Sequence, residues 1–323
     1  MTENNKYFSI IVCPNCKSAL NWSQNYAECK KCDKKYHIEK EIIRFLDSND
    51  KFYENVYTRQ IHYMPGKNPV KNWAFFNLIQ SGILGEIKKN TKPGDRILDI
   101  GCAGGIKWLG EYARAVGLDI SMGSLLEAKD FYEAVVQSDV INLPFQNSFF
   151  NLIYGSYIFE HLLPSDKELF LKEAYRVLKP QGKLILQFDA LSNNWLTRFA
   201  LRDQKAYKRG FIDIDKHIGL EPLSETIKRL KKADLNVIRA IKFGTTFIQY
   251  EPTYNWLNIS YGEKVPWVRF LGKITRKIMA SKYSGMAMEF FVTIFDRLIN
   301  FFFPIDSTTR AILIIEKKIK ISR

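Results

Sequence analysis

Residues 98–105, with the sequence LDIGCAGG, constrain the fold more than any other part of this chain. An apolar run ends there in closely spaced small residues, as it does where a buried strand turns into a helix. Small residues let the backbone approach a ligand closely, and the N-terminus of a following helix offers N–H groups that favour negative charge. The turn alone predicts only a nucleotide-like ligand, because several nucleotide-binding folds share such a loop.

Helices and strands are predicted to alternate along most of the chain. Helical periodicity covers residues 72–90, 167–178 and 224–233, with Ser224 as the expected N-cap of the third helix. The residues 180–182 are expected to form a turn. Alternation of this kind predicts an α/β fold with helices on both faces of a mostly parallel sheet. The expected strands are 96–102, 113–119, 134–140, 149–157, 183–188, 235–242 and 311–315.

Four of the five cysteines form two close pairs near the N-terminus, Cys13 with Cys16 and Cys29 with Cys32. Two CxxC pairs separated by 12 residues are typical of a zinc ribbon, in which four thiolates close a tetrahedral, structural Zn²⁺ site. Free thiols or two disulfides are the alternatives. We expect a zinc ribbon over residues 1–48, folded by its metal, followed by a larger domain over residues 49–323.

Two long stretches, 191–223 and 244–309, interrupt the alternation. Within the second we expect a helical insertion over residues 245–309, and residues 264–282 carry six basic residues and no acidic one. A basic amphipathic helix followed by a broad apolar face suits a membrane interface over residues 264–303. The alternative is a lid over an acceptor pocket or a contact between two copies. Both interpretations favour a hydrophobic or lipid-linked substrate.

The formal net charge of +14 favours an anionic partner such as nucleic acid, a phospholipid surface or a phosphorylated substrate. The N-terminus lacks the pattern of a signal peptide, and we see no membrane-spanning segment. We therefore expect a cytoplasmic protein, which would contact the inner membrane face only if the basic insertion is a membrane interface rather than a lid or a contact between copies. The sequence does not predict an oligomeric state.

Acidic residues follow the next two strands after the small-residue turn. Asp119 ends the second strand, where a carboxylate suits bidentate hydrogen bonding to two ribose hydroxyls. Asp139 ends the third strand, where a carboxylate can accept a hydrogen bond from an adenine amino group. Together with the turn, these acids predict S-adenosylmethionine as the cofactor.

Residues 70–243 resemble the class I S-adenosylmethionine-dependent methyltransferases of the small-molecule type, of which the quinone-biosynthesis enzymes are members. The resemblance is carried by Gly101, Asp119 and Asp139, followed by FFNLIYGSYIFEHL and EAYRVLKPQGKLILQF. It implies a Rossmann-like α/β fold with a seven-stranded sheet, an antiparallel last strand and the cofactor across the carboxyl ends of the strands. Ala103 stands where the family usually has a second Gly, and Asn151 where it often has Asp.

The resemblance also implies roles for single residues. Asp99 and Gly101 shape the turn beneath the methionine part of the cofactor, and Gly155 and Ser156 lie near its methyl-bearing sulfur. The full set of expected cofactor-binding residues is Asp99, Gly101, Cys102, Ala103, Gly105, Asp119, Ile120, Asp139, Val140, Gly155 and Ser156.

The candidates for catalysis are His161 and His217, with Glu160 as a third. Methyl transfer is an in-line displacement, so a general base is needed only where the nucleophile must lose a proton. In some quinone O-methyltransferases a similar glutamate–histidine pair takes part in a metal site. The alternative role of His161 is to pack or to donate a hydrogen bond.

Three functions remain open at the level of sequence. The first is methylation, on oxygen, of a small or lipid-linked acceptor. The second is methylation of RNA, because an N-terminal zinc ribbon before this fold also resembles a ribosomal-RNA guanine methyltransferase and the charge suits phosphate. GSYIFE stands where enzymes that methylate the exocyclic amino groups of bases carry an Asn/Asp-Pro-Pro-Tyr/Phe motif, which argues against that subclass. The third is a partner-binding module on a degenerate methyltransferase fold.

Overall fold

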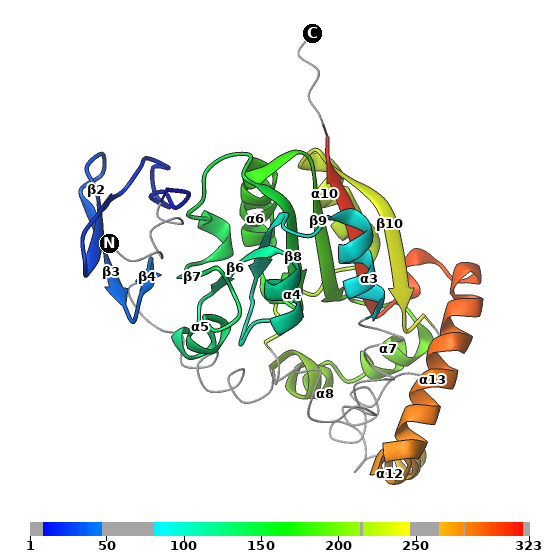
Figure 1. Cartoon of the computed structure of the whole chain (residues 1–323). Helices are drawn as coiled ribbons and strands as arrows, with labels where there is room; N and C mark the ends of the chain where they lie inside the picture. The colour runs from blue at the N-terminus through cyan, green and yellow to red at the C-terminus, as the bar shows by residue number, and fades with distance from the viewer. Residues whose placement is uncertain (1–8, 47–80, 214–215, 246–264, 281, 319–323) are drawn as a thin grey trace.

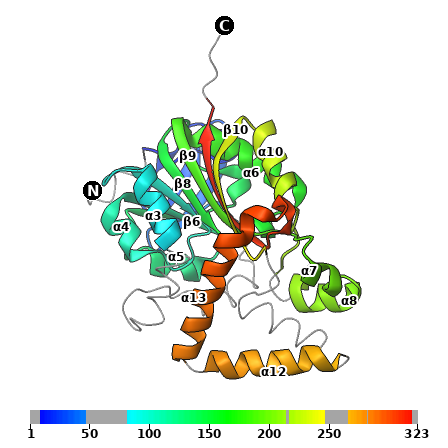
Figure 2. The ribbon, with the colours of Figure 1, turned by 90° about the vertical axis from the view of Figure 1, so that its right-hand side faces the viewer.

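The computed structural model describes residues 9–46, 81–213, 216–245, 265–280 and 282–318. Within these ranges 11 strands form one sheet in the order β1-β2-β3-β4-β7-β6-β5-β8-β9-β11-β10, covered by helices on both faces (Figure 1, Figure 2). The mostly parallel α/β fold predicted from the sequence is confirmed. The strand count differs from the seven expected, because four N-terminal strands extend the sheet.

All seven strands expected for the central sheet are present, and β11 runs antiparallel to both of its neighbours, β9 and β10. The residues expected to form a turn, 180–182, lie within β9 at a shift of register, since Phe150 of β8 pairs with Leu178 whereas Leu152 pairs with Lys183. The seven strands are β5 (Arg96–Ile100), β6 (Arg114–Asp119), β7 (Ala134–Gln137), β8 (Phe150–Ser156), β9 (Leu178–Asp189), β10 (Leu235–Phe243) and β11 (Arg310–Lys317).

Side chains alternate between two apolar layers, one on each face of the sheet. Leu98 of β5 belongs to the layer covered by α6 (Pro164–Val177) and α10 (Leu223–Lys232). Its neighbour Ile97 belongs to the layer covered by the other three helices. These are α3 (Ser81–Asn90), α4 (Lys107–Tyr112) and α5 (Met122–Ala128).

The observed helices begin at other residues than predicted in two cases, and in a third case part of the predicted helix is not described. Residues 72–80 of the first predicted helix lie outside the described residues. α6 begins three residues earlier than expected, at Pro164, because proline is well suited to the first turn of a helix. The prediction of Ser224 as an N-cap is wrong: α10 is preceded by Pro222, and the Ser224 hydroxyl donates to Asp306 Oδ2 at 2.7 Å.

Two groups of helices lie beyond the carboxyl ends of the parallel strands (Figure 1). The first, in the stretch after β9, comprises α7 (Trp195–Ala200), α8 (Gln204–Tyr207) and the π-helical turn η5 (Lys208–Ile212). The second, between β10 and β11, comprises α12 (Pro266–Ala280), α13 (Lys282–Ile299) and the short 3₁₀ turns η6 (Asn300–Phe302) and η7 (Ile305–Ser307). Among the described helices, none has both the length and the apolar character needed to cross a bilayer.

The N-terminal segment folds as four short strands, and its last strand joins the main sheet. β4 pairs in parallel with β7, Ile43 opposite Val136, so that the N-terminal segment and the larger domain share one sheet. The predicted boundary near residue 48 lies outside the described residues and stays a prediction. The four strands are β1 (Asn21–Trp22), β2 (Tyr26–Cys29), β3 (Lys34–Glu39) and β4 (Ile42–Arg44).

Candidate functional site

The turn after β5 has a backbone that small residues make possible. Gly101 and Gly105 both have positive φ angles, of 61° and 78°. A Cβ atom on Gly105 would lie 3.0 Å from Ala128 Cα, which leaves no room for a side chain. Ala103 also has a positive φ, of 45°, which explains why the related family prefers glycine at this position.

A buried tyrosine braces this turn from below. The Tyr132 hydroxyl donates to Asp99 Oδ2 and accepts from the backbone N–H of Ile106. Burial raises the pKa of Asp99 to about 7, and the nearby charge of Asp119 acts in the same direction. Asp99 therefore supports the shape of the turn from inside the protein, with Tyr132 as a partner that the sequence did not reveal.

Asp119 closes the turn from the neighbouring strand. Its Oδ2 accepts a hydrogen bond from the N–H of Ala103 and its Oδ1 accepts one from the N–H of Ser121, both at 2.9 Å. These two bonds hold the carboxylate in one orientation at the end of β6. The structure thus brings together the two sequence-predicted elements, the small-residue turn and the acid of the next strand.

The other residues predicted around the turn differ in their exposure. Cys102 is buried, and its Sγ would lie 2.8 Å from a Cβ on Gly117, so its side chain packs against β6. Ile120 is half-buried, and its carbonyl accepts a hydrogen bond from Gln137 Nε2 at 2.9 Å.

Asp139 begins the loop after β7. Its Oδ1 accepts a hydrogen bond from the N–H of Ile141 at 3.2 Å, which caps the short 3₁₀ turn η3 (Val140–Asn142). Burial raises the pKa of Asp139. Val140, the next residue, is buried.

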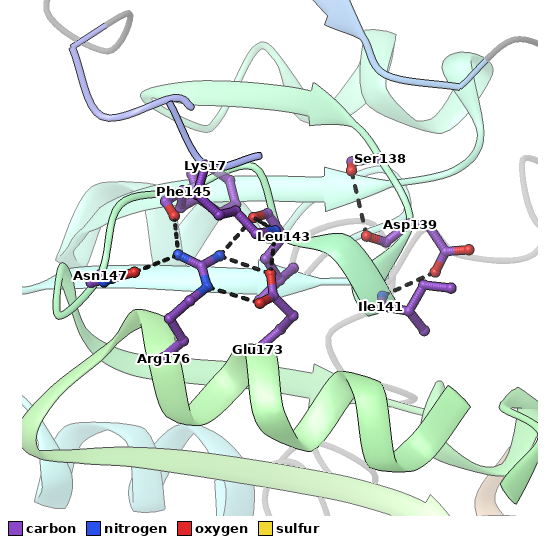
Figure 3. A network of polar contacts seen from close by, with 9 residues as sticks. All are labelled: Lys17, Ser138, Asp139, Ile141, Leu143, Phe145, Asn147, Glu173 and Arg176. Atoms are coloured by element: carbon purple, nitrogen blue, oxygen red, sulfur yellow. Dashed lines mark hydrogen bonds and ion pairs between the residues drawn. The ribbon is translucent and has the colours of Figure 1, made fainter. Parts of the chain in front are cut away.

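A polar network fixes the far end of the same loop and ties it to the N-terminal segment (Figure 3). Arg176 of α6 donates to the carbonyls of Leu143 and Phe145, at 2.8 and 2.6 Å. Lys17, which follows Cys16, donates to the Leu143 carbonyl and to Glu173 Oε2. Burial alone would raise the pKa of Glu173, but the hydrogen bonds from Arg176 and Lys17 outweigh it and lower that pKa.

Gly155 and Ser156 lie at the carboxyl end of β8. A Cβ on Gly155 would come within 2.9 Å of Ile100 Cγ1, so the close contact between β5 and β8 requires glycine. The Ser156 hydroxyl donates to Gln187 Oε1 at 3.4 Å, and Gln187 Nε2 donates to the Tyr157 hydroxyl at 2.6 Å. Asn151 lies at the opposite end of β8, where its Oδ1 accepts from Lys179 and from the N–H of Arg96. Its role is therefore structural.

The three candidate catalytic residues come together beside β8. Glu160 and His161 lie in the 3₁₀ turn η4 (Phe159–His161), and the rings of His161 and His217 are 5.1 Å apart. Ligand atoms of Glu160, His161 and His217 all lie within 4.8 Å of one another, an arrangement that could also hold a metal ion. Gly219 makes this possible, because a Cβ there would lie 1.8 Å from the Leu162 carbonyl.

Burial in this cluster disfavours the charged forms of both Glu160 and His161. Burial raises the pKa of Glu160 to about 8, and Asp189 contributes in the same direction. Burial and the neighbouring His217 lower the pKa of His161 to about 4. Glu160 Oε1 accepts from the N–H of Asp189, whereas its Oε2 has no hydrogen-bond partner within the described part of the chain.

The four N-terminal cysteines also converge. Cys13 Sγ lies 3.5 Å from Cys32 Sγ, and Cys16 Sγ lies 3.3 Å from Cys29 Sγ. All four sulfurs lie within 4.8 Å of one another. Four thiolates around zinc at about 2.3 Å would lie about 3.8 Å apart, so this cluster has the size of a tetrahedral zinc site.

The known proteins most informative about this chain are methyltransferases. Residues 98–186 match the family model described as a methyltransferase domain. Residues 98–186 of this chain therefore correspond to a methyltransferase domain. The matched region covers the turn after β5, Asp119, Asp139, Glu160 and His161, whereas His217 lies outside it.

Curated relatives share the same region. The chain is 33% identical over 143 residues to a ubiquinone/menaquinone biosynthesis C-methyltransferase of Neisseria meningitidis, covering 38% of this chain and 57% of that protein. It is 33% identical over 109 residues to an uncharacterized methyltransferase of Synechocystis, covering 32% of this chain and 51% of the relative. The chain thus spans about half the length of the curated relatives it matches.

Solved structures include a phosphoethanolamine N-methyltransferase of Haemonchus contortus in complex with S-adenosylmethionine. It superposes with a TM-score of 0.45 at 17% identity, covering 85% of this chain and 60% of that chain.

Proposed function

We propose that this chain is an S-adenosylmethionine-dependent methyltransferase that methylates an oxygen atom of a small or lipid-linked acceptor. One observation carries the proposal: two groups of residues lie at the same end of the sheet. The small-residue turn follows β5, Asp119 ends β6 and Asp139 follows β7, while Glu160 and His161 follow β8 and meet His217 from the stretch after β9. The first group suits the cofactor and the second suits the acceptor.

The residues of the first group fit S-adenosylmethionine. The carboxylate of Asp119 is fixed by two backbone N–H groups, so it is oriented for the two ribose hydroxyls. Asp139 would accept from the adenine amino group, and the backbone from Gly101 to Gly105 would lie under the methionine part. When bound, the cofactor supplies a methyl group on a positively charged sulfur, which a well-aligned nucleophile attacks directly.

The second group can take a proton from a hydroxyl acceptor. His161 Nδ1 lies 3.2 Å from the Lys216 carbonyl, so this nitrogen carries the proton and Nε2 is the basic one. Since its pKa is lowered to about 4, His161 is neutral at physiological pH. Glu160, with its pKa raised to about 8, keeps a proton and can donate through Oε2. An acceptor hydroxyl held between them would give its proton to His161 Nε2 while its oxygen attacks the methyl group.

The walls beside His217 are apolar, which supports a hydrophobic acceptor. The ring of Phe211 lies 5.1 Å from the His217 ring, and Phe211 packs in a cluster with Leu196 and Tyr207. The relative from Neisseria meningitidis is named for ubiquinone and menaquinone biosynthesis, which also favours a small apolar acceptor. Since that relative is a C-methyltransferase, methylation of carbon is the main competing outcome.

We also propose that the cysteine cluster binds a structural zinc ion. The Sγ separations match a four-thiolate site, and the Tyr36 hydroxyl lies 3.1 Å from Cys13 Sγ, where it can donate to a thiolate. With four protein ligands the site has no open position, so its role is to fold the ribbon.

Cofactor binding is tested by calorimetric titration with S-adenosylmethionine. Asp119→Ala removes the expected ribose contacts and should weaken binding about 100-fold, because hydrogen bonds to charged groups contribute about 1.5–3 kcal/mol each. The matched control is Asp95→Ala, since Asp95 accepts a hydrogen bond from Lys92 N at the opposite end of β5. Equal affinity of both variants would refute the assignment of the site.

The acceptor is tested by transfer of labelled methyl groups into a cell extract, followed by partition between organic solvent, RNA and protein. Label in the organic phase, on oxygen, is the expected result, whereas label in RNA or on carbon would overturn the proposal. His161→Asn and His217→Asn should lower turnover about 100-fold or more, as expected for loss of general-base catalysis. His37→Asn, at an exposed histidine of β3, is the matched control and should change nothing.

A further inference from the structure

The helices α12 and α13 lie at the edge of the molecule (Figure 2), and together with the turn η6 they carry exposed apolar side chains. Globular proteins seldom leave a large contiguous apolar patch exposed unless it binds something. We call this surface the hairpin face. It is defined by six side chains that are between 41% and 73% exposed: Trp267, Phe270, Phe291, Leu298, Phe301 and Phe302.

The hairpin face is directed outward by the way α13 is attached. Asp296 is buried, and its carboxylate accepts hydrogen bonds from the backbone N–H groups of Gly244 and Thr245, at 2.7 and 3.1 Å. Phe291 and Leu298 lie seven residues apart, two helical turns, on a side of α13 that this contact leaves exposed. The polar anchor thus fixes which side of α13 faces solvent.

The attachment of α12 has the same effect. Val268 is buried in a small apolar cluster with Leu196 and Tyr207, which belong to α7 and α8. Trp267 packs its ring 5.2 Å from that of Phe199 and is still 41% exposed. Phe270 is 62% exposed on the same helix. One side of α12 therefore seats the helix, and another is left apolar and open.

A row of cations lies beside the apolar residues of α12. Arg269, Lys273 and Lys277 follow one another at intervals of four residues and are all exposed. The sequence of α12 contains no acidic residue. Two copies packed through this surface would bring their cationic rows together, which disfavours a dimer contact. An anionic lipid surface complements both the apolar side chains and the cations.

We propose that the hairpin face docks on an anionic phospholipid surface. The apolar side chains enter the boundary between headgroups and acyl chains, with α12 in the plane of the surface and its cations among the headgroups. Docking needs no cofactor and no acceptor, so it stands apart from the methyl transfer proposed above.

The position of the hairpin face also suggests where the acceptor comes from, an inference that rests on the proposed function. The cluster that seats Val268 also packs against Phe211, whose ring contacts His217. The hairpin face and the acceptor side of the site therefore share a wall, and both lie beyond the carboxyl ends of the parallel strands (Figure 1). A protein docked in this way would take its acceptor from the lipid phase next to that wall.

Vesicle flotation tests the docking directly, using the full chain without cofactor. The probes are vesicles of phosphatidylcholine alone and vesicles in which about a third of the lipid is phosphatidylglycerol, since juxtamembrane cations respond to anionic lipid. We expect flotation with the anionic vesicles and much less with the neutral ones. Phe270→Ser should weaken binding about tenfold, given the transfer free energy of a large apolar side chain. Lys273→Gln should weaken it about fivefold and reduce its salt dependence.

Matched controls separate docking from general surface effects. Leu169→Ser changes an apolar residue of α6 that is 46% exposed, and Lys231→Gln changes an exposed lysine of α10; neither should alter flotation. Equal flotation of Phe270→Ser and the parent chain would overturn the proposal. The proposal would also be overturned if the parent chain did not bind vesicles but sedimented as a dimer, and if Phe270→Ser converted that dimer to a monomer. The affinity of these variants for S-adenosylmethionine, measured by calorimetry, should be unchanged. This measurement separates a failure of docking from a failure of the proposed methyltransferase function.

Discussion

The chain adds two units to its methyltransferase domain, and they are attached in different ways. The N-terminal ribbon shares the main apolar core, because Ile11 and Ile43 belong to the same cluster as Leu98 of β5. The helices α12 and α13 use a separate small cluster around Val268 and the single carboxylate of Asp296. A unit that shares the core also shares its stability, whereas one seated on its own small cluster can present a surface without disturbing the site.

The ribbon reaches the proposed cofactor site by two routes. Arg44 of β4 donates to Gln137 Oε1, and Gln137 donates in turn to the carbonyl of Ile120, next to Asp119. On the other side, Lys17 donates to the carbonyl of Leu143 in the loop that Asp139 begins. The comparison therefore predicts that changes in the ribbon alter cofactor affinity and changes in the hairpin face do not.

Removal of zinc should have the largest effect. A structural zinc ion supplies most of the folding free energy of a small ribbon, so a strong chelator or Cys13→Ser should lower the melting temperature by about 10 °C or more. Affinity for S-adenosylmethionine should fall as well, because the loops around Asp139 and Ile120 lose their supports. Calorimetry and elemental analysis for zinc measure both effects.

The hairpin face provides the control for that experiment. Phe270→Ser should leave the melting temperature and the cofactor affinity as they are, since this side chain is 62% exposed. If the metal-free protein bound the cofactor with unchanged affinity, the ribbon would not support the cofactor site, and the predicted difference between the ribbon and the hairpin face would be wrong.

The network around Arg176 and Glu173 should affect both stability and cofactor affinity (Figure 3). Arg176→Leu removes bonds to two loop carbonyls and leaves Glu173 with Lys17 alone, so we expect a loss of about 3 kcal/mol of stability. Cofactor affinity should fall about tenfold, because the loop that begins at Asp139 loses its anchor. Urea unfolding and calorimetric titration give the two values.

The matched control is Arg229→Leu. Arg229 is 21% exposed, close to the 18% of Arg176, and it bonds Glu221 and Glu168 on the opposite side of α6 from the ribbon. It should lower stability to a similar degree without changing cofactor affinity. Were both variants to weaken the cofactor equally, the effect would be one of global stability.

The central strands and the N-terminal ribbon could be predicted from the sequence, whereas contacts between distant segments could not. Apolar runs located all seven central strands, most of which are buried on both faces, whereas the edge strand β10 is exposed over much of its length. The spacing of Cys13, Cys16, Cys29 and Cys32 located the ribbon. The position of Ser224 inside α10 was missed, because Asp306, distant in the sequence, takes its hydroxyl.

The residues that support the site were harder to predict. Tyr132 braces the turn from the loop just before β7, and no local pattern links it to Asp99. Gln137 offered one signal, since a polar residue ends the apolar strand β7. The spacing of Glu173 and Arg176 predicts a pair on one helix face but not their bonds to a distant loop. Such contacts join segments far apart in the chain, which periodicity cannot reveal.

The acceptor side should differ from the ribbon in its response to pH. The pKa of His161 is lowered to about 4 in the folded protein, below the 6.5 of an exposed histidine, because burial disfavours its charged form. The stability from this neutral histidine is present above pH 6.5 and is lost as the pH falls toward 4. His161→Asn should flatten that decline in urea unfolding measured across this range. The exposed ribbon histidine, tested with His37→Asn, should leave it intact, and an unchanged curve for both variants would contradict the burial of His161.

The smallest effect is expected inside the turn itself, away from both additions. Ala103 has a positive φ, so Ala103→Gly should relieve strain and raise stability by up to about 1 kcal/mol. Cofactor affinity should stay the same or improve slightly. Ser148→Gly is the control, since Ser148 also has a positive φ but lies in a turn before β8. A loss of affinity in Ala103→Gly alone would show that the alanine methyl group contacts the cofactor.

The pairing of β4 with β7 has a consequence for the chain as a whole. Phe45 N donates to the Gln137 carbonyl, and the parallel pairing of Ile43 with Val136 satisfies the outer side of β7. Without β4 that row of backbone groups would be open to a strand from another molecule, a common start of aggregation. We therefore expect a chain shortened to start after the ribbon to aggregate through the uncovered edge of β7, rather than only to bind the cofactor more weakly.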